Sequence, residues 1–154
     1  MIKEILINSD ILETDAQVIA HGVAEKNIED MATGLAYLIN QKFPESFKEL
    51  KKKRMARSFK LGDVIICDNT EPAVAYLATQ QDLYTAKLSA INKALRNLDK
   101  QMIKQGYSTC AIPKIGCGYG KQKWEDVKEI FHSRLSQSQV TYFVYVGFNY
   151  FREE

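Results

Sequence analysis

The stretch that decides the fold is residues 110–127, which read Cys-Ala-Ile-Pro-Lys-Ile-Gly-Cys-Gly-Tyr-Gly-Lys-Gln-Lys-Trp-Glu-Asp-Val. An apolar run ends at Pro113, glycines occupy every second position from Gly116 to Gly120, and a helical pattern begins at Trp124. This order is typical of a phosphate cradle, because glycine lets the backbone approach an anion and a helix N-terminus carries partial positive charge. The same order also occurs in a plain tight turn, so the stretch alone leaves both interpretations open.

Length and composition bound the class of protein. The chain has 154 residues, with 45% hydrophobic and 26% charged residues, which is typical of one globular domain spanning 1–154. Its formal net charge of +2 gives no indication of nucleic-acid binding. We expect a cytoplasmic protein without a membrane segment, since no apolar run approaches the roughly 20 residues that span a bilayer and no signal peptide is visible.

The cysteines and histidines predict no metal site and no cofactor. Cys67, Cys110 and Cys117 form no C-x-x-C pair and lie apart in the sequence, and the chain has only 2 histidines. We expect the cysteines to be reduced residues that pack in the interior.

Hydrophobic periodicity predicts six strands and four helices. The predicted strands are 1–8, 16–21, 64–67, 73–79, 109–113 and 140–146, and the predicted helices are 31–42, 44–57, 84–105 and 124–135. The clearest helix is 84–105, whose apolar stripe consists of Leu88, Ile91, Leu95, Leu98 and Met102. Residues 68–72 read as the turn of a hairpin. Strands alternating with helices predict an α/β fold, with a mixed sheet of about six strands between two helix layers.

Two loops stand where ligands bind in such folds, at the carboxyl ends of strands. Gly22–Gly34 follows the second predicted strand, and Ile115–Gly120 follows the fifth. Each loop precedes a helix, so two helix N-termini and their free N–H groups can converge on one diphosphate.

Four pieces of sequence carry a resemblance to a known family. They are Ser-Asp-Ile-Leu with Ala-Gln-Val-Ile-Ala-His (9–12 and 16–21), Met-Ala-Thr-Gly-Leu-Ala (31–36), Pro-Lys-Ile-Gly-Cys-Gly (113–118) and Trp-Glu-Asp-Val (124–127). In this order they resemble the macrodomain, the ADP-ribose-binding fold, over nearly the whole chain. The chain is most similar to the branch that contains terminal ADP-ribose glycohydrolases, antitoxin-type DNA ADP-ribosyl glycohydrolases and ADP-ribose 1″-phosphate phosphatases.

The resemblance implies a single three-layer α/β/α macrodomain that binds ADP-ribose or a derivative, free or attached to protein or nucleic acid. It implies that Asp10 accepts a hydrogen bond from the adenine amino group, that Ile11 packs beside the base and that Phe148 covers it. The implied ligand-binding residues are Asp10, Ile11, Ala20, His21, Met31, Thr33, Gly34, Leu35, Thr79, Pro113, Ile115, Gly116, Cys117, Gly118, Tyr119, Gly120 and Phe148.

Three departures from that branch bear on activity. Ala24 stands where the branch usually has Asn or Ser, Gln80 where its glycohydrolases have a lysine, and Gly120 where some members have an acid. We therefore expect removal of a 1″-phosphate, or slow ester hydrolysis, rather than fast glycohydrolysis. The same departures also favour a non-catalytic reader of ADP-ribose.

His21, Glu25 and Asp30 are the candidate catalytic residues. The reference pKa of histidine suits proton transfer, but a histidine at this position also reads as a structural residue bonded to a neighbouring loop. Glu25 reads as either a solvated or a catalytic acid, and Asp30 as either a helix cap or a group that positions water.

Two other features have alternative interpretations. Cys117 between glycines is either a small packing residue or a thiolate nucleophile at a helix N-terminus. The basic run from Lys48 to Lys60 is either a solvated helix end or, through Lys51–Arg57, a contact surface for nucleic acid. We expect the protein to be a monomer.

Overall fold

The computed structural model describes residues 1–5, 9–25, 34–56, 58–82, 85–117 and 120–147. Its elements, in chain order, are β1 (Ile2–Ile5), the 3-10 turn η1 (Ile11–Glu13), β2 (Val18–Ala24), α1 (Gly34–Lys42), α2 (Pro44–Ala56), β3 (Val64–Cys67), β4 (Ala73–Gln80), α3 (Leu88–Lys104), β5 (Thr109–Pro113), α4 (Trp124–Leu135) and β6 (Thr141–Tyr145). The predicted elements are therefore present, with the differences in their bounds given below.

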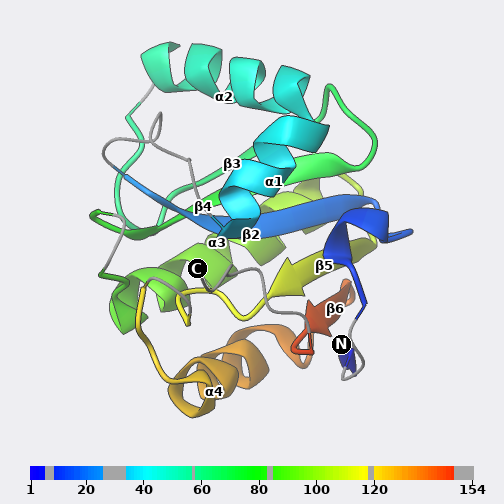
Figure 1. Ribbon diagram of the computed structural model, residues 1–154. Helices are drawn as coiled ribbons and strands as arrows, with labels where there is room; N and C mark the ends of the chain where they lie inside the picture. Colours follow the sequence, from blue (N-terminus) through cyan, green and yellow to red (C-terminus); the bar gives the residue numbers. More distant parts are fainter. Residues whose placement is uncertain (6–8, 26–33, 57, 83–84, 118–119, 148–154) are drawn as a thin grey trace.

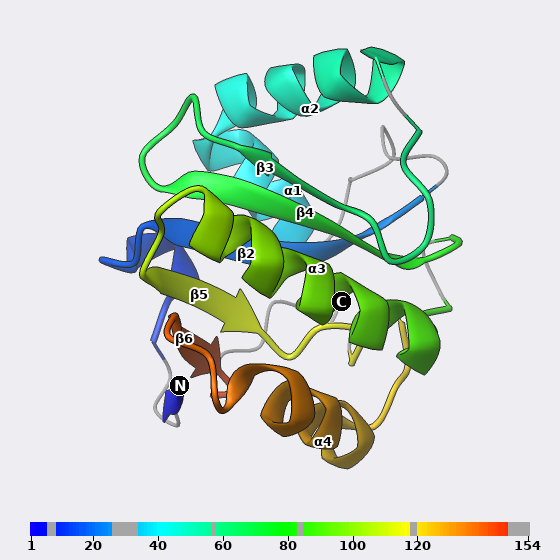
Figure 2. The same cartoon turned by 180° about the vertical axis from the view of Figure 1, so that it is seen from behind.

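The strands form one mixed sheet of six strands in the order β1-β6-β5-β2-β4-β3. All neighbours are parallel except β3 and β4, which form the predicted antiparallel hairpin with Val64 opposite Leu77. The α3 helix connects β4 to β5 and crosses over β2, which lies between them (Figure 2). Because β2 and β5 are parallel neighbours, their carboxyl ends reach the same edge of the sheet.

The helices cover both faces of the sheet, α1 and α2 on one side and α3 and α4 on the other (Figure 1). Along β2 the side chains alternate between the two layers, as the period of two in a strand requires. Val18 and Ala20 belong to the core under α3 and α4, whereas Ile19 and Val23 belong to the core under α1 and α2. The three-layer α/β/α prediction is confirmed.

The α3 helix differs from its prediction at its N-terminal end. It begins at Leu88 instead of residue 84, because Ala86 forms an isolated bridge with Gln80 and the N–H of Lys87 donates to the carbonyl of Thr79. Leu88 is 36% exposed, so the prediction that it belongs to the apolar stripe is wrong. The stripe begins one turn later, at Ile91.

The β2 strand is longer than predicted. It continues past His21 to Ala24 because it pairs with β4 as far as Gln80, with a register shift between Val23 and Ala24. The expected loop after it therefore begins at Glu25. The expected helix start around Asp30 and Met31 lies outside the described residues, and α1 is described from Gly34.

Within the ranges described above, no helix is long and apolar enough to cross a membrane.

Candidate functional site

The candidate site lies at the carboxyl edge of the sheet, beyond the point where the pairing of β2 with β5, at Ile19 and Ala111, ends. The chain leaves β2 toward α1, which covers one face, and leaves β5 toward α4, which covers the other. Adjacent parallel strands that diverge in this way open a crevice between them, which is the usual ligand position in open α/β sheets. Both loops predicted from the sequence start here.

The glycine turn after β5 has no room for side chains at its two ends. A Cβ on Gly116, whose φ is +76°, would lie 2.7 Å from Ile91 Cδ1. A Cβ on Gly120 would lie 2.6 Å from the Ala86 Cβ and 2.7 Å from the carbonyl oxygen of Gly116. Glycine is thus required at both positions, at Gly116 by conformation as well and at Gly120 by space alone. Gly118 and Tyr119 lie outside the described residues.

The segment before α3 supports this turn. The N–H of Ala86 donates to the carbonyl of Gly120 at 3.2 Å, and the Gln122 side chain donates to the carbonyl of Ala86 at 2.8 Å. The starts of α3 and α4 are thereby held close together. Neither Lys87 nor Lys123, at the N-cap positions of these helices, makes a side-chain cap. The positive ends of two helix dipoles therefore flank the turn.

A buried hydroxyl without a partner lies close to Gly22 and Ile115. Thr79 is 0% exposed, and its Oγ1 has no hydrogen-bond partner. A Cβ on Gly22 would lie 2.6 Å from that oxygen and 3.2 Å from the Ile115 Cγ2. Burying a hydroxyl without a hydrogen bond costs free energy, and a bound ligand can supply the missing partner.

Asp10 and Ile11, the two residues expected to meet the adenine, differ sharply in exposure. The exposed Asp10 caps η1, with its Oδ1 accepting from the N–H of Leu12 at 2.9 Å. Ile11 is 0% exposed and belongs to the core under α1 and α2. The adenine-binding roles of Asp10 and Ile11 both stay predictions.

His21 is buried rather than presented to the site. It is 2% exposed, neither ring nitrogen has a hydrogen-bond partner, and its ring meets Tyr76 edge-on with centroids 4.9 Å apart. The interpretation of a histidine bonded to a neighbouring loop is therefore wrong. Burial lowers the pKa of His21 to about 3, so the imidazole is neutral near pH 7.

Glu25 is held by backbone groups from two other segments. Its N–H donates to the carbonyl of Gln80 at 2.9 Å, and its carboxylate Oε2 accepts from the N–H of Leu61 at 2.8 Å. Its carbonyl accepts from the Arg54 guanidinium at 3.0 Å. The half-buried Glu25 is thus not a solvated surface acid. Asp30, the third catalytic candidate, lies outside the described residues.

Cys117 does not have the surroundings of a nucleophile. Burial raises the pKa of its thiol to about 11, and its Sγ lies 3.6 Å from the carbonyl oxygen of Ile115. The thiol stays protonated at neutral pH, which supports the interpretation of a packing residue. Among the described residues, no three His, Cys, Asp or Glu side chains gather as metal ligands would.

The remaining candidates for ligand binding are spread over the same edge and the core behind it. Ala20, Pro113 and Ile115 are buried, Leu35 is half-buried, and Gly34 begins α1 with a φ of +63°. Met31, Thr33 and Phe148 lie outside the described residues. Gln80, at the position of the lysine expected from the resemblance, is buried and donates to the carbonyl of Asp82 at 2.7 Å.

The basic run is divided by the helical period of α2. Ser46 and Leu50 are buried, and Lys53 and Arg54 follow them on the inward side. Lys53 donates to the carbonyl of Ile66 in β3 at 2.9 Å. Lys48, Lys51 and Lys52 are exposed. Neither the solvated helix end nor the nucleic-acid surface describes the whole run, because Lys53 and Arg54 bond to backbone carbonyls while Lys48, Lys51 and Lys52 are exposed.

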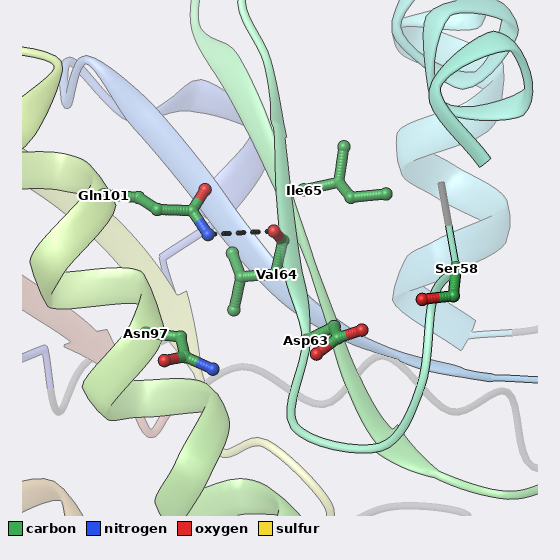
Figure 3. Close-up of a pocket in the computed structure, with 6 residues that line it drawn as sticks. All are labelled: Ser58, Asp63, Val64, Ile65, Asn97 and Gln101. Carbon is green, nitrogen blue, oxygen red and sulfur yellow. Dashed lines mark hydrogen bonds between the residues drawn. The ribbon is translucent and has the colours of Figure 1, made fainter. Parts of the chain in front are cut away.

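A polar cavity of about 250 Å³ lies on the outer side of β3, away from the junction of β2 and β5 (Figure 3). Its lining residues are Ser58, Asp63, Val64, Ile65, Asn97 and Gln101. Gln101 donates to the carbonyl of Val64 at 2.9 Å. Together with Lys53 it occupies two outward carbonyls of an edge strand, which protects that edge against pairing with another strand.

Sequence reasoning missed three residues that shape the site: Arg54, Ala86 and Gln122. Arg54 was counted among surface charges, and the period of α2 would have placed it on the side of Leu50. No sequence signal marks Ala86, because its role depends on a contact with Gly120, which lies 34 positions later in the chain.

Comparisons with known proteins agree with this architecture. A family model described as "Macro domain" matches residues 24–131, more than half of the chain. The ADP-ribose glycohydrolase OARD1 of Bos taurus is 24% identical over 116 residues, which cover 75% of this chain and 73% of that protein.

Two solved structures share the fold. The macrodomain of Mycobacterium tuberculosis DarG superposes with a TM-score of 0.82 at 22% identity, covering 95% of this chain and 97% of that one. Thermosipho africanus DarTG in complex with ADP-ribose has a TM-score of 0.79 at 19% identity, covering 89% of this chain and 39% of that one. With the glycine turn, the sheet order and the family match in agreement, this chain belongs to the Macro domain family.

Proposed function

We propose that this protein binds ADP-ribose or a derivative of it at the carboxyl edge of the sheet, and that it hydrolyses such derivatives. In this proposal the diphosphate lies between the ends of β2 and β5, against the glycine turn. The observation that carries the proposal is the turn itself, where Gly116 and Gly120 leave no room for a Cβ. Such a turn offers backbone N–H groups to an anion beside the N-termini of α3 and α4.

The names of the related proteins support the choice of ligand. The Bos taurus relative is named an ADP-ribose glycohydrolase, and the Thermosipho africanus structure is a complex with ADP-ribose. A ligand of that kind also suits Asp10, because an acceptor-only carboxylate at the surface matches an exocyclic amine.

We propose hydrolysis that relies on the held substrate rather than on a side-chain nucleophile. Gln80 and Glu25 both bond within the protein, and the pKa of the buried His21 is lowered to about 3. Removal of a 1″-phosphate or of an ester-linked ADP-ribose needs mainly a fixed diphosphate and an oriented water. The same observations favour a second candidate, a reader module that binds ADP-ribose without turnover.

Calorimetry with ADP-ribose tests binding, with ADP and ribose 5-phosphate as partial ligands. We expect ADP-ribose to bind more tightly than either fragment. No measurable binding at millimolar ADP-ribose contradicts the proposal. Turnover of ADP-ribose 1″-phosphate and of an ester-linked ADP-ribose by the same protein then separates hydrolase from reader, because a reader shows no rate above the uncatalysed one.

Thr79→Val tests whether the buried hydroxyl contributes to ligand binding. Removing an unsatisfied buried hydroxyl without changing the side-chain shape should raise the unfolding free energy of the free protein by about 1 kcal/mol. If ADP-ribose contacts the hydroxyl, its affinity falls at the same time. Urea unfolding and calorimetry on the same variant give the two results. Greater stability with unchanged affinity shows that the hydroxyl makes no ligand contact.

We further propose that the protein acts on ADP-ribose that is attached to a nucleic acid, and that the exposed lysines of α2 bind this nucleic acid. The charges to neutralise are Lys48, Lys51 and Lys52, because Lys53 bonds to β3 and its loss would weaken the fold. Oligonucleotide binding that falls steeply with salt in the wild type and is lost in the triple variant would support this. Unchanged binding in the triple variant would contradict it.

Our proposals of a monomeric state and a cytoplasmic location are tested by sedimentation and by cell fractionation.

A further inference from the structure

Every polar group of Glu25 bonds to a different part of the fold. Its N–H bonds to Gln80 at the end of β4, its carboxylate to Leu61 in the segment before β3, and its carbonyl to Arg54 near the end of α2. Glu25 directly follows Ala24, the last residue of β2, at the carboxyl edge of the sheet. The exit of the chain from β2 is therefore fixed by bonds from three segments.

Arg54 completes this arrangement from the inward face of α2. Its guanidinium lies 5.6 Å from the centroid of the Phe59 ring, in cation–π range, and Phe59 is 7% exposed. Phe59 and Leu61 belong to the same short segment, so that segment contacts Arg54 through its ring and Glu25 through its backbone. Arg54 and Glu25 thus contact the same segment, and Arg54 also donates to the carbonyl of Glu25.

We propose that Glu25 and Arg54 are positioning residues, which fix the carboxyl end of β2 at the edge of the sheet where ADP-ribose is proposed to bind, and that neither reacts with the ligand. The inference rests on the proposed ADP-ribose binding. It assigns Glu25 a role different from the catalytic one considered from the sequence. It also gives the C-terminal end of α2 a function in ligand affinity, although α2 follows α1 and not a strand that ends at the site.

The chemistry of the Glu25 bond allows a sharp test. An amide oxygen accepts from the Leu61 N–H as a carboxylate does, so Glu25→Gln keeps the bond and removes the charge. Glu25→Ala removes both. For a positioning residue, Glu25→Gln should keep the ADP-ribose affinity within about threefold, because the bond to the Leu61 N–H remains, and Glu25→Ala should lose about tenfold or more, because that bond is gone. A catalytic base would instead lose turnover equally in both variants while ADP-ribose affinity stays at the wild-type level.

Arg54 has a matched control in its neighbour. Lys53 also points inward and donates to a strand carbonyl, but that carbonyl belongs to Ile66 in β3. We expect Arg54→Met to weaken ADP-ribose binding by about tenfold, and Lys53→Met to leave it unchanged. Asp63→Ala is a second control, because its carboxylate bonds to the N–H of Lys60 in the same segment without contacting β2.

Hydrogen exchange gives a readout that does not depend on turnover. The amide of Leu61 should exchange faster in Glu25→Ala than in Glu25→Gln, and ADP-ribose should slow it in the wild type, because coupling between two sites is reciprocal. Failure of the wild type to bind ADP-ribose contradicts the proposed function and, with it, this inference. Wild-type binding with unchanged affinity in both Glu25→Ala and Arg54→Met contradicts this inference alone.

Discussion

At the scale of single residues, His21 has the most unusual surroundings in the described chain. It is a titratable ring at 2% exposure, beside Tyr76, with neither nitrogen bonded. A protonated ring there would be a buried charge without a partner, which is why its pKa is lowered to about 3. The neutral form is compatible with the native packing, and the charged form is not.

Stability should therefore fall as the pH falls through the range in which an unfolded histidine titrates. The unfolded pKa is about 6.5 and the folded one about 3, so between these values the unfolded state binds the extra proton. His21 alone should cost about 2 kcal/mol of unfolding free energy at pH 5 relative to pH 8. Urea unfolding from pH 5 to 8 measures this. The slope of unfolding free energy against pH should be smaller in His21→Phe and unchanged in His132→Gln, because His132 is exposed. A wild-type curve without that slope contradicts the prediction.

Gly120 supplies a second test at this scale, since the resemblance places an acid at that position in some relatives. Gly120→Ala should lower the unfolding free energy by about 1–3 kcal/mol, because the new Cβ would overlap Ala86 and the carbonyl of Gly116. Gly120→Asp should lose ADP-ribose binding rather than gain turnover. Gly106→Ala is the control: nothing lies within 4 Å of its Cβ, and only its φ of +80° is unfavourable. A Gly120→Asp variant with normal stability and faster hydrolysis would overturn this account.

At the scale of elements, tertiary contacts decide where a helix or strand begins and ends. The apolar stripe of α3 was predicted from its spacing, yet Leu88 lies outside it, because the segment before the helix bonds to Thr79 and Gly120 instead. The β2 strand extends beyond the predicted run 16–21, because β4 pairs with it as far as Gln80. In contrast, α4 has its predicted bounds of Trp124–Leu135, and Trp124 packs on Phe131 with ring centroids 5.3 Å apart.

The difference between the two ends of the α3 stripe can be measured. Leu98 is 0% exposed in the core under α3 and α4, so Leu98→Ala should cost about 2–5 kcal/mol through lost burial and the cavity it leaves. Leu88→Ala should cost about 1 kcal/mol or less, as is usual away from the core. Equal losses in the two denaturation curves would show that the stripe does extend to Leu88.

At the scale of the whole molecule, the sequence predicted the order of elements, the mixed sheet and both helix layers, because periodicity reports which faces are buried. It predicted the carboxyl edge as the site, since that follows from parallel strands. It did not reveal that Glu25 is bonded to Leu61 or that Arg54 points inward, because these contacts join residues that are 36 and 29 positions apart in the chain. The roles of Asp30, Met31 and Phe148 stay predictions, because these residues lie outside the described ranges.

Binding of ADP-ribose should stabilise the entire fold, because the site draws on strands β2, β4 and β5 and on helix α3. At a ligand concentration of 100 times Kd, mass action adds about 2.7 kcal/mol, which raises the melting temperature by about 5–10 °C in a chain of this size. Thermal denaturation with and without ADP-ribose measures the shift. ADP should give a smaller one, and an absence of any shift at saturation would contradict binding to the native state.

The close approach of Ala86 and Gly120 also restricts which substitutions can be accepted at position 120 during evolution. A Cβ at position 120 would lie 2.6 Å from the Ala86 Cβ, so a side chain can enter at 120 only where residue 86 has become glycine or the turn follows another path. Because the carbonyl of Gly116 is equally near, the second route is the more accessible one. Among descendants of this sequence, substitutions at 86 and 120 should appear together, or together with a change in loop length, and an ancestor with an acid at 120 should have carried a differently shaped segment ahead of α3.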